Sequence, residues 1–405
     1  MVCGAVRSVK RLDAIEPTPH LPSMRTALLI LPALAFVVAC GRGAAPAPDV
    51  VRTDSAGVRL ITSGARDTVL PWAFREIDVF RDSVGEPWLF TNVGPSDVLA
   101  DRAGRTYVVT RDPSIVRFDR SGRFDRTIGR KGGGPGEFEF PMSIGSQGDT
   151  IFVHDVAKQA LVRFSPDLSP ASDRRLEGAL SRAERFFFRT GGLWYRQMDF
   201  TDSMQVASVF ADTLGGAPLQ SVRNRPGGAA DFGCVKLRFP PLFSPQLLLH
   251  SSVARLLVNA QPAYELWLYE GPRALASIRR PLSPRAPTEA DVRSLHPNGM
   301  TVGFVGGRPD CSVPVEDLIA KQGVAATYPF VFDVVLLPDG TMWALRTPAA
   351  FRPAVVDVFN SEGVYAGSTT GMGLPLAMLP NGELLFARDD AESGGVVVVR
   401  MKGTR

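Results

Sequence analysis

Residues 98–110 read VLADRAGRTYVVT, and residues 115–124 continue with IVRFDRSGRF. Two short apolar runs flank a turn that ends at Gly104, and a third apolar run follows a polar loop. Runs of β-branched and aromatic residues joined by turns of Asp and Gly are typical of β-hairpins. This stretch is therefore expected to form a small antiparallel sheet.

The same sequence pattern recurs along the chain: a turn glycine, a β-branched or aromatic run, a polar loop and another apolar run. The clear copies are GDTIFVH at 148–154 with LVRFSPD at 161–167, LPDGTMWALR at 337–346 with VVDVFNSEGVY at 355–365, and LPNGELLFAR at 379–388 with VVVVR at 396–400. Weaker copies fit residues 191–210 and 254–269. The spacing between Phe118 and Phe164 is that of a propeller blade.

Counting these copies predicts an all-β fold, a six-bladed β-propeller over residues 57–405. The expected blades cover 93–129, 139–178, 183–222, 243–280, 329–368 and 373–402. The chain ends soon after the third strand of the last copy, so that blade lacks its outer strand. We expect the strand-like run at 57–62 to supply it and to close the ring.

Two intervals, about 223–242 and 281–328, do not follow the repeat. In the second interval Thr288 is followed by Asp291, which imitates the capping box of a helix. We therefore predict a short helical insertion between blades four and five.

The first residues have the pattern of an export signal. Residues 24–38 carry one arginine and then an apolar run that Pro32 interrupts, which is short for a membrane span. The run leads into VVACG at 37–41, which resembles the lipobox of bacterial lipoproteins.

This resemblance implies cleavage before Cys40 and its acylation, and a buried helix with a chance cysteine is the alternative. We expect a leader at 1–39 with its working start at Met24, and a flexible tether at 40–56. The lipid would anchor the protein to the cell envelope, on the outer membrane or the periplasmic face.

The remaining cysteines agree with export. Besides Cys40, the mature chain holds Cys234 and Cys311, an even pair in a compartment that permits disulfides. Two thiols without neighbouring histidines make a poor metal site, and two unpaired buried cysteines are the other alternative. We predict a Cys234–Cys311 disulfide that ties the two insertions together on one face.

The composition excludes two classes of protein. Hydrophobic residues are 45% and charged residues 21%, which is ordinary for a globular chain and excludes wholesale disorder. The 45 basic and 41 acidic residues leave a net charge of +4 that is not gathered on one stretch. A nucleic-acid partner is therefore not expected.

Motifs for catalysis are missing from the sequence. The glycine-rich run at 129–136 has no Gly-Lys-Ser/Thr and no helix after it, so an inter-blade turn is favoured over a phosphate loop. The histidines of the mature chain, His154, His250 and His296, stand at no metal-ligand spacing, and Gly-x-Ser-x-Gly is absent. We predict no catalytic residue, no metal and no cofactor, which favours a binding protein over an enzyme.

One segment points to a family. IGRKGGGPGEF at 128–138, followed by Pro141 and the strand at 148–155, resembles the linker and strand of NHL-type six-bladed propellers. More narrowly, residues 93–168 resemble bacterial six-bladed propeller lipoproteins of unknown role. The aspartate that usually follows the second strand is Asp155 here, but other copies carry threonine or arginine. The resemblance implies a platform that binds a ligand or a protein, and no known activity.

Basic residues recur where the second strands of blades are expected to end, at one rim of the central channel. Cations from several blades would focus their field there on an anion, and arginine binds carboxylate or phosphate through two hydrogen bonds. A structural ring of salt bridges with nearby aspartates is the alternative. The candidate ligand-binding residues are Arg111, His154, Arg346 and Arg388, and the aspartates are Asp112, Asp155, Asp389 and Asp390.

The resulting hypothesis is a monomeric, membrane-anchored propeller that binds a protein, peptide or glycan, with an anionic ligand at the channel mouth. The alternative is a propeller hydrolase or lyase with a metal in the channel, as in some six-bladed relatives.

Overall fold

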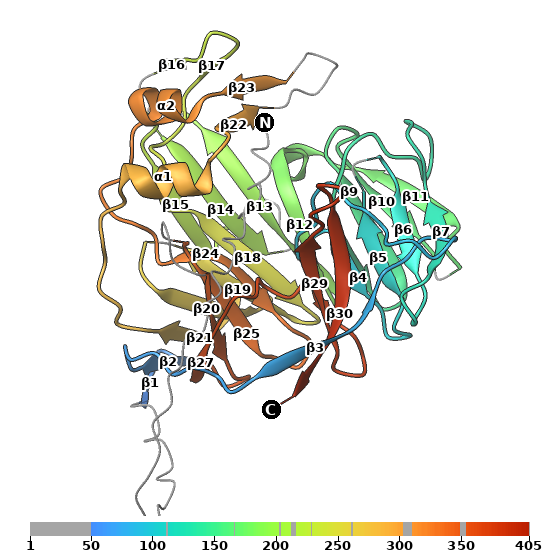
Figure 1. Ribbon diagram of the computed structural model, residues 1–405, viewed down its shortest axis with the longest axis horizontal. Coiled ribbons are helices and arrows are strands. Elements are labelled where there is room, and N and C mark those ends of the chain that lie inside the picture. Colours follow the sequence, from blue (N-terminus) through green and yellow to red (C-terminus); the bar gives the residue numbers. More distant parts are fainter. Residues whose placement is uncertain are drawn as a thin grey trace, which may run out of the picture.

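The computed structural model describes residues 50–404 except 111, 166, 202–203, 212–215, 228, 261, 303–309 and 349–353. Their strands form six antiparallel blades, so the predicted all-β six-bladed propeller is confirmed (Figure 1). The observed blades begin and end within a few residues of the expected ones.

The first three blades follow the chain in order, each with its first strand innermost. Blade one is β4 (Val98–Ala100), β5 (Thr106–Val109), β6 (Ile115–Phe118) and β7 (Phe124–Ile128). Blade two is β8 (Pro141–Gln147), β9 (Thr150–Asp155), β10 (Ala160–Phe164) and β11 (Pro170–Arg175). After the 3-10 turn η1 (Gly178–Arg182), blade three is β12 (Ala183–Arg189), β13 (Gly192–Phe200), β14 (Gln205–Ala211) and β15 (Gln220–Asn224).

The last three blades use the same order, and the N-terminal segment adds strands to two of them. Blade four is β18 (Leu247–Ser252), β19 (Arg255–Ala260), β20 (Glu265–Glu270) and β21 (Arg273–Arg279). Blade five is β24 (Val331–Leu336), β25 (Met342–Arg346), β26 (Val355–Phe359) and β27 (Tyr365–Thr370). Blade six is β28 (Ala377–Met378), β29 (Leu384–Asp389), β30 (Val396–Thr404) and the N-terminal β3 (Ala73–Val79).

The middle strands are apolar because blades pack face to face. All four residues of β5 and of β6 are buried. Val108 and Val116 of blade one share a hydrophobic cluster with Leu385 and Val398 of blade six. A strand buried on both faces needs apolar residues on both, which explains the unbroken runs in the repeat.

An N-terminal strand closes the ring, as predicted, but residues 57–62 are not that strand. The closing strand is β3, which pairs antiparallel with β30. The run at 57–62 lies mostly in β2 (Val58–Ser63), which pairs with β1 (Val50–Ser55) and runs parallel to β21, outside blade four. β2 is held in this position by Ile61, which is 2% exposed and belongs to the hydrophobic cluster between blades four and five.

The glycine-rich linker at 129–136 joins β7 to β8, as expected for an inter-blade turn. Gly129 has a φ of 72°, and a Cβ there would lie 2.3 Å from the ring of Phe138, which is fully buried. Only glycine allows this close approach.

The two irregular intervals form one small unit beside the blades. The first interval contains β16 (Ala230–Asp231) and β17 (Lys236–Leu237). The second contains α1 (Glu289–Leu295), β22 (Met300–Val302), β23 (Cys311–Val313), α2 (Val315–Asp317) and the π-helical turn η2 (Leu318–Gln322). The predicted helix is α1, and Thr288 and Asp291 form its capping box. We call this unit the insertion unit.

The insertion unit has its own core and its own cross-link. Phe232 from the first interval is buried against Val292, Val313 and Leu318 from the second. Cys234 and Cys311, the pair proposed from the sequence, form a disulfide with their Cα atoms 5.8 Å apart. The shared core and the disulfide join the two intervals into one unit.

Among the residues that the structure describes, no helix is both long and apolar enough to cross a membrane.

Candidate functional site

The insertion unit and the strand ends proposed as a rim lie on the same face of the propeller. Because strands alternate in direction within a blade, the second and fourth strands end on one face, where the next first strand begins. Both irregular intervals follow fourth strands, β15 and β21. In Figure 1 the insertion elements gather at one end of the molecule. We call this end the insertion face.

Arg346 lies at this face, but its guanidinium is already paired. Its Nε donates to Asp357 Oδ2 at 3.0 Å and its Nη2 to Asp357 Oδ1 at 2.9 Å. Its Nη1 donates to Asp67 Oδ2 at 3.0 Å. Although burial opposes the charged form, the hydrogen bonds to Asp67 and Asp357 raise the pKa of Arg346. With a further bond from Nη2 to Asp67 Oδ1, four hydrogen bonds join the guanidinium to the two carboxylates.

The same carboxylates hold a second arginine. Arg280 has a fully buried side chain, and its Nη1 donates to Asp357 Oδ2 at 3.0 Å. Its guanidinium lies 3.8 Å from the ring centre of Tyr365. Burial raises the pKa of Asp67, but hydrogen bonds from Arg346 and Arg280 outweigh it, so that pKa is lowered. This cluster, which we call the Asp357 network, binds the N-terminal segment to blades four and five.

Arg388 and His154 lie in environments that differ from that of Arg346. Arg388 pairs with Glu76 by reaching across β30 to the outer strand β3, and both side chains are partly exposed. His154 is 1% exposed, with its ring edge-on to Phe186. Burial, with a smaller effect of Arg185, lowers the pKa of His154 to about 3, so it is neutral at pH 7.

The described candidates therefore do not form the shared cluster of unpaired cations that the sequence suggested. Arg346 and Arg388 meet carboxylates from different elements, and His154 carries no charge at pH 7. Arg111 and Cys40 lie outside the described residues. Asp67 and Glu76, which pair with Arg346 and Arg388, come from the N-terminal segment that the repeat did not include, whereas Asp357 lies in the repeat copy of blade five.

A different set of polar residues stands at the start of the inner strands. β8, β12 and β24 each contain an irregularity after their first residue, and the residue beyond it is Ser143, Arg185 or Asp333. These three pair with His154, Arg196 and Leu345 of the second strands. They therefore occupy equivalent positions in blades two, three and five.

His250 lies close to the axis of the ring. Its Nδ1 accepts a hydrogen bond from the Leu336 amide of blade five at 3.2 Å, and the ring also bonds to the backbone of Pro95, before blade one. Blades one and four are opposite in a ring of six, so a blade-four imidazole that reaches both must be central. Burial lowers its pKa to about 4, which leaves the ring neutral at pH 7.

Arg185 and Asp333 lie on the inner strands of blades three and five, the two blades on either side of blade four. Burial raises the pKa of Asp333 to about 6, with partial opposition from the Val334 amide and from the charge of Arg185. The charge of Arg185 also lowers the pKa of His154 and of His250. Arg185, His250 and Asp333 stand on β12, β18 and β24, the inner strands of three successive blades. We call Arg185, His250 and Asp333 the axial site.

The repeat pattern did not predict the axial site, because the turn glycine marks the second strand of a blade and these three residues lie on first strands. A signal was present in the first strands. Asp333 is a single charge within the apolar run VFDVVL at 331–336, and Arg185 directly precedes the run FFF at 186–188, where a packed strand is expected to be uncharged. Within the residues described here, no three His, Cys, Asp or Glu side chains gather as a metal site.

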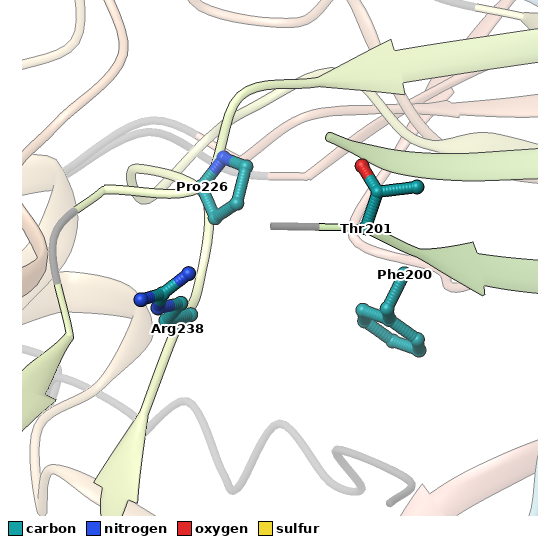
Figure 2. Close-up of a pocket in the computed structure, with 4 residues that line it drawn as sticks. All are labelled: Phe200, Thr201, Pro226 and Arg238. Carbon is teal, nitrogen blue, oxygen red and sulfur yellow. The ribbon is translucent and has the colours of Figure 1, made fainter. Parts of the chain in front are cut away.

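A cavity of about 600 Å³ opens beside the insertion unit. Phe200 and Thr201 at the end of β13 face Pro226 and Arg238 of the first interval across it (Figure 2). Phe200 is 67% exposed, so its aromatic ring is accessible from solvent. The cavity combines this exposed aromatic ring with a cationic side chain.

The fold and the arrangement of its strands define the class of the protein, a six-bladed β-propeller. A family model described as a 6-bladed beta-propeller, DUF5128, matches residues 99–222, which correspond to blades one to three. A search of curated proteins found no match.

Several solved structures are similar in fold. A Bacteroides fragilis protein described as exported is 11% identical with a TM-score of 0.49, covering 85% of this chain and 100% of its own. The calcium-binding regucalcin of Agrobacterium tumefaciens is 12% identical with a TM-score of 0.38, covering 83% and 97%. Virginiamycin B lyase of Staphylococcus aureus is 10% identical with a TM-score of 0.36, covering 82% and 99%. These likenesses concern the fold and carry no conclusion about function.

Proposed function

We propose that this propeller is an envelope-anchored binding platform that engages a protein, peptide or glycan through its insertion face. One observation carries the proposal: the insertion unit and the cavity at Phe200 both lie at this face, where Arg185 and Asp333 also stand near the beginning of their strands. The resemblance of residues 93–168 to NHL-type propeller lipoproteins supports the same function.

The structure of the insertion unit favours a role in binding a partner over a role as a simple linker between blades. A blade-to-blade linker needs only a few residues, whereas these two intervals build a shared core and a disulfide. Rigid scaffolds commonly carry their binding residues on such loops. A body that is ordered before binding loses less conformational entropy when a partner arrives.

The cavity supplies an anchor for a partner. An exposed aromatic side chain beside an arginine is the composition that dominates binding energy in protein interfaces. Phe200 comes from blade three and Arg238 from the insertion unit, so a ligand seated there would contact both parts.

A site-specific cross-linking experiment tests this function. A photoreactive phenylalanine analogue at position 200 of the membrane-anchored chain is expected to form a defined adduct in intact cells. Excess unlabelled protein should compete for the adduct. Changing both Cys234 and Cys311 to serine should weaken it, because the insertion unit loses its cross-link.

The matched control places the same analogue at Asp149, an exposed residue in the turn between β8 and β9 on the opposite face. Equal adducts at positions 149 and 200, or no competable adduct at 200, would contradict binding through the insertion face.

The lipid anchor has a separate test. Changing Cys40→Ala is expected to move the protein from the membrane fraction to the soluble fraction, because acylation requires the thiol. Fractionation with immunoblotting measures this, and metabolic labelling with a fatty acid should be lost in the same variant. Membrane retention equal to that of the unchanged chain would rule out Cys40 as the anchor.

A further inference from the structure

We infer a second binding site on this propeller, distinct from the cavity at Phe200, that takes an extended peptide of a partner protein. The peptide adds a strand to β7, the outer strand of blade one, and places an apolar and an acidic side chain into a neighbouring cavity. We call this site the β7 groove.

The outer edges of blades in this chain already accept added strands. The N-terminal segment pairs in turn with the outer strands of blades four, five, six and one. β2 runs beside β21, Leu70 N–H donates to Ser368 O of β27 at 2.9 Å, β3 pairs with β30, and Arg81 bridges to Arg123, the residue before β7. Addition of a strand at an outer edge is therefore a mode of packing that this fold uses.

Blade one has most of its outer edge open. Phe124 N–H donates to Arg81 O at 3.0 Å, and the N-terminal segment then reverses in a turn at 82–86. Among the described residues, no further strand pairs with the outer edge of β7 from Asp125 to Ile128. Such an edge presents a row of backbone N–H and C=O groups with which another chain can pair.

A cavity of about 400 Å³ lies beside this open edge. Residues 126–128 of β7 line it on blade one, and Phe164, Leu168 and Pro170 line it on blade two. Phe164 is 1% exposed, and Leu168 packs against the same hydrophobic cluster while remaining partly open to solvent. An apolar side chain of a strand added to β7 can contact these residues.

Arg126 provides a charge for the same ligand. It stands two positions before Ile128, which packs with Phe164, so both side chains lie on the same face of β7. The side chain of Arg126 is 54% exposed, and its Nε lies 3.9 Å from Asp125 Oδ1. Asp125 already accepts a hydrogen bond from Arg117 Nε at 2.5 Å. The Arg126 guanidinium can therefore bind a carboxylate of a ligand.

These contacts select the class of ligand. A peptide backbone supplies the regular donors and acceptors that pair with β7, whereas a free anion or a sugar does not. Side chains two positions apart in an added strand face the same side, so one apolar and one acidic residue can reach Leu168 and Arg126 together. Arg130, the other arginine of the cavity, already donates to Glu137 at 2.8 Å.

Fluorescence anisotropy with the full chain in detergent tests the inference. The probes are labelled Ser-Thr-Val-Thr-Glu-Thr-Ser and the same peptide with Val and Glu exchanged, which cover a parallel and an antiparallel added strand. The better of the two is expected to bind at least about tenfold more tightly than its counterpart with Lys in place of Glu. Changing Arg126→Glu should reverse this preference.

Two further measurements examine the apolar contact and the backbone pairing. Leu168→Asn should weaken binding about threefold or more, because the contact is lost while asparagine tolerates the φ of 67° at this position. Two peptides carry backbone N-methyl groups, one at Val and Glu and the other at the Thr residues beside them. Only one of the two should lose binding, because an added strand pairs through one of its edges.

The matched control is Arg388→Gln, which removes an arginine of blade six that is paired with Glu76 and should leave peptide affinity unchanged. Failure of both peptides to bind, equal affinity for the Glu and Lys peptides, or equal effects of the two methylation patterns would overturn the inference. A dimer in solution that Arg126→Glu dissociates would assign the groove to a second copy of this chain and would also overturn it. The cross-link at position 200 reports on a different cavity, so either test can fail without the other.

Discussion

Changing Asp357→Ala is expected to lower the free energy of unfolding by about 3–5 kcal/mol, because a buried ion pair that loses one partner leaves an uncompensated charge. Asp357 and the side chain of Arg280 are fully buried. Asp357 also accepts hydrogen bonds from the Tyr264 and Ser368 hydroxyls, both at 2.6 Å. Chemical denaturation followed by tryptophan fluorescence measures the loss.

The matched control removes a carboxylate from an exposed pair. Changing Glu76→Ala leaves Arg388 in solvent and should cost no more than about 1 kcal/mol. If Asp357→Ala were as mild as Glu76→Ala, the Asp357 network would not be a stabilising element. Arg346 would then be open again as a ligand-binding candidate.

Removing the closing strand is expected to have a larger effect still. A chain that begins at residue 93 lacks β3, which leaves the nine residues of β30 as an unpaired edge. It is expected to aggregate and to show no cooperative unfolding transition. Light scattering and thermal denaturation measure these outcomes.

A second truncation separates β3 from β2. A chain that begins at residue 64 loses β1 and β2 but keeps Asp67 and β3. It should remain monodisperse and unfold cooperatively, although losing the buried Ile61 should cost about 2–5 kcal/mol. The assignment of β3 as the closing strand would be wrong if this chain lost its fold as completely as the shorter one.

The repeat made the blades predictable, whereas the ring closure depended on contacts distant in sequence. The turn at Gly104 and the apolar runs around it act within one hairpin, so their pattern is local. β3 carries Arg75, Glu76 and Asp78, which hide its strand character, and its partner β30 lies at the other end of the chain. An edge strand tolerates such charges because one side of it faces solvent.

The candidate rim was predicted by counting along the second strands. Of the residues chosen there, those that the structure describes, His154, Arg346 and Arg388, proved to be buried or paired. Arg346 meets Asp67, 279 positions away, and this pairing follows from the path of the N-terminal segment. The axial site depends on strand irregularities before Arg185 and Asp333, which shift the register of their side chains.

By itself, then, the sequence determined the number of blades, the position of the helical insertion with its Thr288 cap, and the face that carries the irregular intervals. These features arise from periodicity and turn chemistry, which act over a few residues. Only the tertiary structure decided which strand closes the ring, which arginines are neutralised and which remain unpaired. A charge is paired or free according to what the rest of the fold places beside it, and Arg346 is paired by Asp357 of its own blade and by Asp67 of the N-terminal segment.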